Sequence, residues 1–269
     1  MSITNHFAKS TYVTISLEYQ RIVCYFFSMK KLDLRKYKGY LFDFDGTLVD
    51  TPQVWANAES RVLTEYGINR SIAFKDEWAL FASQNEDNGE PLYIQWWKHI
   101  ILKYGIKGTS AQELLNKSFG LGGQMLLDAP YIDGAGEFLK ILKQQQRQLG
   151  LVSMTTDTLI DLIKQNKVLQ SVISLDDAFE QNIVTSDMVK NRKPHPDPYL
   201  LGAKQLGLAS EECVAFEDSV EGARSSVSAN IDTLIYIPDS VSAEKRKQLL
   251  EISPYHFKSF RALKNEFQK

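Results

Sequence analysis

Two aspartates stand on alternate residues at the end of a short apolar run, and they are the strongest chemical signal in the chain. The run, Tyr40–Phe44, has the composition of a buried strand in a parallel sheet, and it carries Asp43 before ending at Asp45 and a Gly-Thr turn. Two carboxylates at such a strand end are costly unless a cation lies beside them. Mg²⁺ takes oxygen ligands and keeps positions open for a substrate phosphate, so the pattern predicts a magnesium site. One carboxylate could then act as a nucleophile and the other as a general acid/base.

A plainer interpretation is an Asp-Gly turn after a strand that happens to carry two aspartates. The ends of the other expected strands help to separate the two interpretations. In open α/β sheets, ligands bind beyond the carboxyl ends of the strands. Polar residues gathered at several strand ends therefore favour a site over a simple turn.

Hydroxyl side chains follow the apolar segment 149–152. Ser153 leaves this expected strand toward the start of a helix, where free amides and the positive end of the helix dipole suit a phosphate oxygen. The alternative is that Thr155 or Thr156 merely caps the helix that begins near Asp157.

A lysine stands at the start of a proline-rich loop. Lys193 precedes three prolines, at positions 194, 196 and 198, which restrict the backbone of the loop. A lysine on a stiff loop could neutralise both a phosphate and an aspartyl nucleophile, although a solvated surface lysine is the competing interpretation. We interpret His195 as a loop residue and not as a base.

A second acidic pair ends another apolar strand. Glu217 and Asp218 follow the segment 213–216, and a helix that contains Gly222 comes next. This pair matches the first as a source of metal ligands. Two carboxylate pairs at two strand ends make surface charge a poor explanation for either.

The order of these motifs resembles the haloacid dehalogenase superfamily of hydrolases and phosphotransferases. The matching motifs are D-x-D-G-T, a strand-end serine, Lys-Pro and Glu-Asp, and the resemblance covers roughly Lys38 to Ile237. The resemblance implies a Rossmann-like core with, in this subgroup, a helical cap inserted after the first motif. It implies that Asp43 is the nucleophile that forms an aspartyl-phosphate, that Asp45 is the general acid/base and that Lys193 stabilises charge. It implies that Thr47 positions the turn and that Ser153 and the Met154 amide contact the phosphate. It also implies that Asp43, the Asp45 carbonyl and Asp218 hold Mg²⁺, with Glu217 contributing directly or through water.

The chain departs from the family pattern at positions outside this catalytic set. Met154 stands where the family often has Asn, and Asn230 where a Gly usually follows the last helix. Arg224 occupies a position that is commonly apolar. These departures bear on substrate contacts and local packing.

The pattern of elements predicts an α/β fold, in which a parallel sheet is covered on both faces and a small all-α domain is inserted after the first core strand. The resemblance implies that the sheet is a Rossmann-like core and that the all-α domain is a cap. We expect the core to comprise 38–52 and 131–269, where strands alternate with helices, and the cap to comprise 53–130, where apolar residues recur at helical spacing. Residues 1–37 form an N-terminal extension. Its first 28 residues are either an appended strand-like arm or a mis-assigned start, with Met29 as the alternative first residue.

Three local expectations complete this outline. A short strand is expected at Val172–Ser174, and a flexible joint at the glycines of segment 120–123. From Ser240 onward, a basic-acidic helix and a closing segment are expected to present a solvated face.

Composition restricts the class of protein. The chain has 269 residues, of which 43% are hydrophobic and 24% charged, and a net charge of −2, which gives no support to nucleic-acid binding. The two cysteines have no metal or redox spacing, and the apolar run 22–27 is too short for a membrane span or a signal peptide. We therefore expect a monomer in the cytoplasm, with no membrane partner.

The leading functional hypothesis is a Mg²⁺-dependent phosphatase, a phosphoric monoester hydrolase, that acts on a small phosphorylated metabolite. A sugar phosphomutase of the β-phosphoglucomutase type is the alternative, and it would need basic cap residues for a second phosphate. A binding or regulatory protein that kept the fold without turnover is the third hypothesis. The candidate basic residues are Arg61, Arg70, Lys75, Lys98 and Lys103.

Overall fold

The computed structural model describes residues 32–69, 77–78, 80–81, 84–85 and 89–267. Within these, the chain from Asp33 onward belongs to one compact unit. Most of the expected N-terminal extension, with the Met29 alternative, lies outside the described residues, and so do Arg70 and Lys75.

Six parallel strands form one sheet in the described part of the chain, in the order β3-β2-β1-β4-β5-β6. The strand that carries the first acidic motif is therefore central. The strands are β1 (Gly39–Phe42), β2 (Gln148–Val152), β3 (Ile183–Val184), β4 (Cys213–Glu217), β5 (Asp232–Tyr236) and β6 (His256–Phe257).

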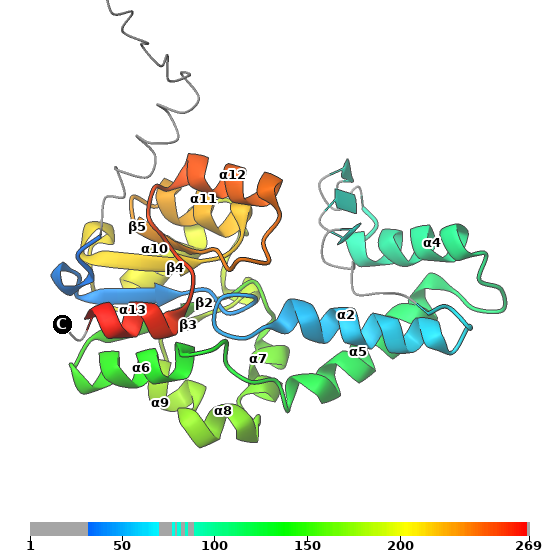
Figure 1. The fold of residues 1–269 in the computed structure, drawn as a ribbon, viewed down its shortest axis with the longest axis horizontal. Coiled ribbons are helices and arrows are strands. Elements are labelled where there is room, and N and C mark those ends of the chain that lie inside the picture. Colours follow the sequence, from blue (N-terminus) through cyan, green and yellow to red (C-terminus); the bar gives the residue numbers. More distant parts are fainter. Residues whose placement is uncertain (1–31, 70–76, 79, 82–83, 86–88, 268–269) are drawn as a thin grey trace, which may run out of the picture. The chain divides into compact units, whose positions relative to one another are not determined.

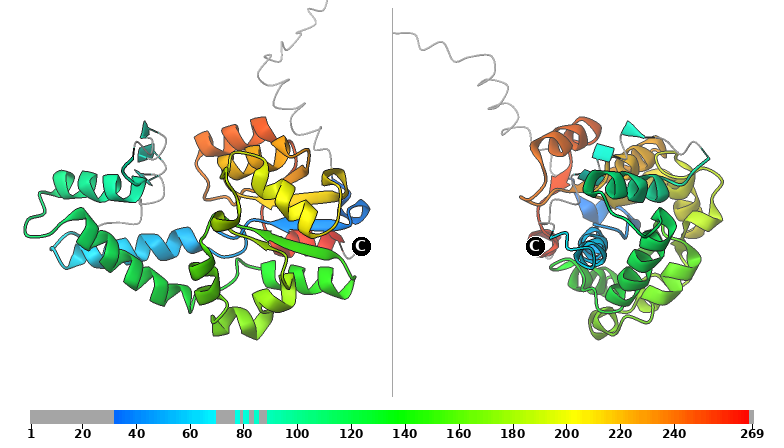
Figure 2. Two further views of the ribbon diagram at one scale, coloured as in Figure 1. Left: turned by 180° about the vertical axis from the view of Figure 1, so that it is seen from behind. Right: turned by 90° about the vertical axis from the view of Figure 1, so that its right-hand side faces the viewer.

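Helices cover both faces of the sheet, as expected for parallel strands joined by crossover helices (Figure 1). One face carries α10, α11 and α12, and the opposite face carries α6, α9 and α13; Figure 2 shows the same layers from behind. The core helices are α6 (Ala135–Gln144), α7 (Asp157–Ile163), α8 (Lys167–Val172), α9 (Leu175–Phe179), α10 (Asp197–Gln205), α11 (Val220–Ser228), α12 (Ala243–Ile252) and α13 (Phe260–Phe267), with 3-10 helices η1 (Leu34–Lys36), η2 (Ser186–Met188) and η3 (Ser210–Glu212).

Burial of the central strand on both faces explains its apolar sequence. Every residue of β1 is buried, and the Phe42 ring stacks on Phe216 with centroids 4.4 Å apart. The register pairs Phe42 with Leu151 of β2 and with Phe216 of β4. The residues after these three positions therefore emerge side by side at the carboxyl edge of the sheet.

Three of the helices that the structure describes lie between β1 and α6 in the sequence, where the chain was expected to insert a helical block. They are α2 (Thr51–Thr64), α4 (Leu92–Tyr104) and α5 (Ala111–Leu126). Val62, Trp96 and Leu114 belong to a buried apolar cluster that these helices share. The α5 helix begins with a capping box, in which Ser110 and Glu113 satisfy each other's backbone amides.

The structure corrects the three local expectations. Segment 172–174 is not a strand: Val172 ends α8, Ser174 caps α9, and the strand next to β2 is β3. The glycines of segment 120–123 lie inside α5, because Gly122 leaves room for the Trp55 ring against the helix. The closing segment supplies β6 and α13, whose Phe260 is fully buried.

Candidate active site

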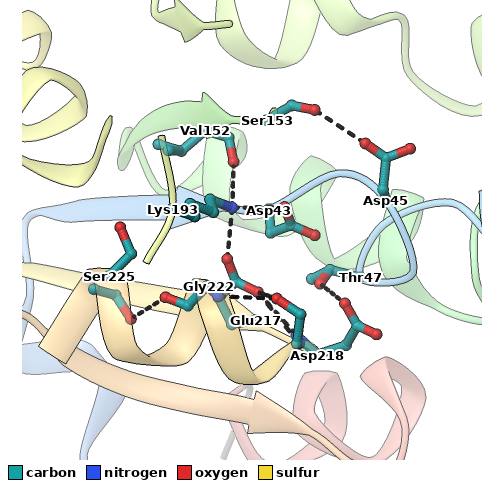
Figure 3. Close-up of polar contacts among 12 residues, drawn as sticks. Asp43, Asp45, Thr47, Val152, Ser153, Lys193, Glu217, Asp218, Gly222 and Ser225 are labelled. Carbon is teal, nitrogen blue, oxygen red and sulfur yellow. Dashed lines mark hydrogen bonds and ion pairs between the residues drawn. The ribbon is translucent and has the colours of Figure 1, made fainter. Parts of the chain in front are cut away.

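Lys193 lies at the centre of a polar cluster at the carboxyl edge of the sheet (Figure 3). Its Nζ donates hydrogen bonds to Asp43 Oδ1 at 2.7 Å, to Glu217 Oε1 at 2.6 Å and to the Val152 carbonyl at 2.9 Å. An ammonium has three hydrogens, and each has an acceptor here. The Lys193 side chain is 5% exposed, so its charge is fixed beside Asp43 and not solvated as a surface lysine would be.

Asp45 is surrounded by hydroxyl groups. Its Oδ1 accepts a hydrogen bond from Thr51 Oγ1 at 2.7 Å, and its Oδ2 accepts from Ser153 at 3.1 Å and Thr155 at 2.7 Å. Figure 3 shows its carboxylate turned toward Ser153, while Asp43 points to Lys193. The two aspartates of the first motif therefore have separate environments, as two different chemical roles require.

The turn after the first motif brings Thr47 and Gly46 against Asp218. Thr47 Oγ1 donates to Asp218 Oδ1 at 3.3 Å. Gly46 has a φ of +86°, and a Cβ there would lie 2.8 Å from Asp218 Oδ2. Glycine at this position thus permits both the turn and the close approach of the second acidic pair.

The sequence interpretation missed Lys245, which belongs to the helix expected to present a solvated face. Its Nζ lies 3.3 Å from Asp218 Oδ2, from the first turns of α12. The interpretation also gave Thr51 no role, and it considered Thr155 as a possible helix cap. Thr155 lies three residues after β2, where capping explains a hydroxyl equally well, and Thr51 is the first residue of α2.

The cluster holds an excess of carboxylates. Burial, then the nearby Glu217 carboxylate, raises the pKa of Asp43 well above its ordinary range. Burial also raises the pKa of Asp218, although Lys245 opposes this effect. Burial by itself would lower the pKa of Lys193, but Asp43 and Glu217 keep it above its ordinary value.

The acidic groups fit a hard divalent cation. Carboxylate oxygens of Asp43, Glu217 and Asp218 lie within 4.8 Å of one another, and burial together with this crowding of negative charge raises the pKa of Asp43 and that of Asp218. An oxygen-only donor set of this kind suits Mg²⁺ better than a soft metal.

Other residues singled out in the sequence lie as follows. Met154 follows Ser153 directly after β2, and His195 is exposed with Nδ1 3.0 Å from Asp197 Oδ1. In the inserted helices, Lys98 pairs with Glu90, and Lys103 pairs with Glu77.

Comparison with known proteins shows the family of the chain. The haloacid dehalogenase-like hydrolase family matches residues 40–236, a range that contains β2 to β5 and all of β1 except its first residue. The chain belongs to this family. Hexitol phosphatase B of Escherichia coli (strain K12) is 25% identical over 219 residues, which are 81% of this chain and 91% of the relative.

Solved structures of the haloacid dehalogenase-like hydrolase family share the fold. A family hydrolase from Deinococcus radiodurans R1, solved with bound phosphate and sodium, aligns with a TM-score of 0.66 at 23% identity, covering 85% of this chain and 93% of the other. A putative β-phosphoglucomutase from Thermotoga maritima aligns with a TM-score of 0.65 at 22% identity, covering 85% and 99%. In the residues that the structure describes, a search for helices able to cross a membrane finds none.

Proposed function

We propose that the protein is a Mg²⁺-dependent phosphatase that hydrolyses a small phosphorylated carbohydrate through an aspartyl-phosphate on Asp43. The observation that carries the proposal is the 2.7 Å contact between Lys193 Nζ and Asp43 Oδ1, with Asp45 held separately by hydroxyls. The similarity to hexitol phosphatase B supports the substrate class. We further propose that it acts as a monomer in the cytoplasm.

In the proposed reaction, a carboxylate oxygen of Asp43 attacks phosphorus and the bond to the leaving oxygen breaks. Asp45 gives its proton to that oxygen, so the alcohol leaves neutral. Asp45 then accepts a proton from water, which attacks the aspartyl-phosphate and releases inorganic phosphate, regenerating Asp43. Lys193 keeps a positive charge beside Asp43 throughout, which stabilises the negative charge of the transferring group.

Asp43, Asp218 and the backbone carbonyl of Asp45 would hold Mg²⁺. When bound, the cation would supply positive charge that offsets the phosphate charge. Ser153 and the Met154 amide would contact the phosphate, and Thr47 would keep the turn in place. Residues 53–130 would act as a cap that excludes water from the reaction.

A sugar phosphomutase is the second candidate, favoured by the fold similarity to the putative β-phosphoglucomutase. It requires cations for a second phosphate. Lys98 and Lys103 already pair with glutamates of the inserted helices, and both are exposed enough to be ordinary surface ion pairs. This observation favours the phosphatase. The contacts of Asp43, Asp45 and Lys193 argue against a protein that binds without turnover, because binding alone does not require them.

The test is phosphate release from a panel of sugar and polyol phosphates with Mg²⁺, comparing the wild type with Asp43→Asn and with Asp239→Asn as a matched control. Asp239 is exposed and pairs with Lys258. Release lost only in Asp43→Asn supports the proposal, and equal release from all three overturns it. Turnover that requires a sugar bisphosphate supports the mutase, and metal binding without turnover supports the third hypothesis.

A further inference from the structure

Tyr199 is a fully buried tyrosine whose hydroxyl reaches the candidate site. It lies in the first turn of α10, and its Oη donates a hydrogen bond of 2.7 Å to Glu217 Oε1. The same oxygen accepts the 2.6 Å hydrogen bond from Lys193. The Lys193 Nζ also lies 5.1 Å from the centroid of the Tyr199 ring, within the range of a cation–π contact.

The other oxygen of Glu217 is occupied as well. Glu217 Oε2 accepts hydrogen bonds from the Asp218 amide at 3.2 Å, the Ser219 amide at 3.4 Å and Ser219 Oγ at 3.1 Å. A Cβ on Gly222 would lie 1.9 Å from Glu217 Oε1, so the carboxylate rests directly against the α11 backbone. Both oxygens of Glu217 are therefore engaged by protein donors, and Oε1 is the oxygen that accepts from Lys193.

The Tyr199 hydroxyl affects how the positive charge of Lys193 is shared between its two carboxylate partners. Asp43 and Glu217 both accept hydrogen bonds from one buried ammonium, at 2.7 Å and 2.6 Å. The hydrogen bond from Tyr199 fixes the Glu217 oxygen and disperses part of its negative charge, so Glu217 holds the ammonium without drawing it away from Asp43. The ammonium can then remain within 2.7 Å of Asp43, where it is needed.

We propose that Tyr199 is a positioning residue for the reaction: its hydroxyl holds Glu217, and Glu217 in turn keeps the Lys193 ammonium against Asp43. The inference rests on the proposed phosphatase function. It changes the expectation for Glu217, which becomes the anchor of the lysine instead of a metal ligand.

The test uses Tyr199→Phe, which removes only the hydroxyl, with Tyr40→Phe as a matched control. Tyr40 is also buried and donates to a carbonyl, that of Leu34. We expect Tyr199→Phe to lower kcat about tenfold while KM stays within about twofold, because the hydrogen bond acts on the charge beside the nucleophile and not on ground-state binding. Affinity for vanadate, which mimics the transferring phosphoryl group, should fall by the same factor, and Tyr40→Phe should change neither quantity.

Two further measurements separate positioning from folding and from metal binding. In the Glu217→Gln background, Tyr199→Phe should lower kcat little further, because both changes act on Lys193 through the same side chain, that of residue 217. Affinity for Mn²⁺, measured by electron paramagnetic resonance, should be the same in wild type, Tyr199→Phe and Glu217→Gln.

Unchanged kcat and vanadate affinity in Tyr199→Phe, or effects that simply add to those of Glu217→Gln, would overturn the inference. Loss of Mn²⁺ affinity in Glu217→Gln would restore Glu217 as a metal ligand and overturn it too. Absence of both turnover and vanadate binding in the wild type would instead remove the proposed function, so the two failures are distinguishable.

Discussion

Thr155 Oγ1 lies 2.7 Å from Asp45 Oδ2 and donates a hydrogen bond to it. The serine at the end of β2 makes a longer contact with the same oxygen, at 3.1 Å. Residue 153 was the expected polar group at this strand end, yet the shorter contact belongs to a residue that could have been only a helix cap. The orientation of the proposed acid/base therefore depends on Thr155 at least as much as on Ser153.

Replacing Thr155 with Val should reduce kcat about tenfold, because Val keeps the shape of the side chain and removes one donor to a charged group. The thermal midpoint should change little, since Thr155 is only partly buried. Steady-state kinetics with the substrate found in the panel would measure the effect. Thr64→Val is the control, because Thr64 Oγ1 only bonds the Ser60 carbonyl within α2. Equal kcat in both variants and the wild type would show that Asp45 does not need this hydroxyl.

The core fold and the order of site motifs could be predicted because strand ends in a parallel sheet converge. The residues at the carboxyl ends of β1, β2 and β4 had to share one edge once the strands were recognised, which places Asp43, Ser153 and Glu217 together. Lys193 does not lie at the end of a strand, so this rule does not place it. Only its proline-rich loop and the family resemblance indicated its position.

The missed features depend on contacts between distant segments. Lys245 resembles any solvated lysine in a basic-acidic helix, and only the packing of α12 beside α11 brings it to Asp218. The expected strand at 172–174 failed because two β-favouring residues, Val172 and Ile173, are too few to outweigh the helices on either side. The strand β6 was missed because it contains two residues at the edge of the sheet.

Two glycines inside helices should respond to alanine in opposite directions. Gly222→Ala should lower the free energy of unfolding by about 3 kcal/mol or more, because the new Cβ would overlap the Glu217 carboxylate. Gly120→Ala should raise it by about 0.5–1 kcal/mol, because Gly120 is exposed in α5 and alanine favours the helix without meeting any neighbour. Urea unfolding followed by circular dichroism would measure both. A Gly222→Ala protein as stable as wild type would mean that the Glu217 carboxylate can move away from α11.

Stability should fall as the pH rises from about 9 to about 12. Burial raises the pKa of Cys213 from 9.0 to about 12, and that of Tyr40 from 10.0 to about 12. The folded protein thus keeps protons that the unfolded chain has lost, so stability is fully present below the unfolded pKa values and is lost as the pH rises through the window. Urea midpoints measured from pH 8 to pH 11 should show the decline, and Tyr40→Phe should flatten it. An identical slope in this variant would mean that Tyr40 does not contribute.

Metal binding should stabilise the folded protein through Asp218. Adding Mg²⁺ to protein treated with a chelator should raise the thermal midpoint, because the cation relieves the repulsion between Asp43 and Asp218 and binds only the folded chain. Asp218→Asn should remove most of this increase.

Lys245→Met should instead tighten Mg²⁺ binding by up to about fivefold, because the Lys245 ammonium already occupies Asp218 Oδ2 and repels a cation there. Differential scanning calorimetry across a Mg²⁺ titration would give all three results. Weaker Mg²⁺ binding in Lys245→Met would show that Lys245 supports the metal site instead of competing with it.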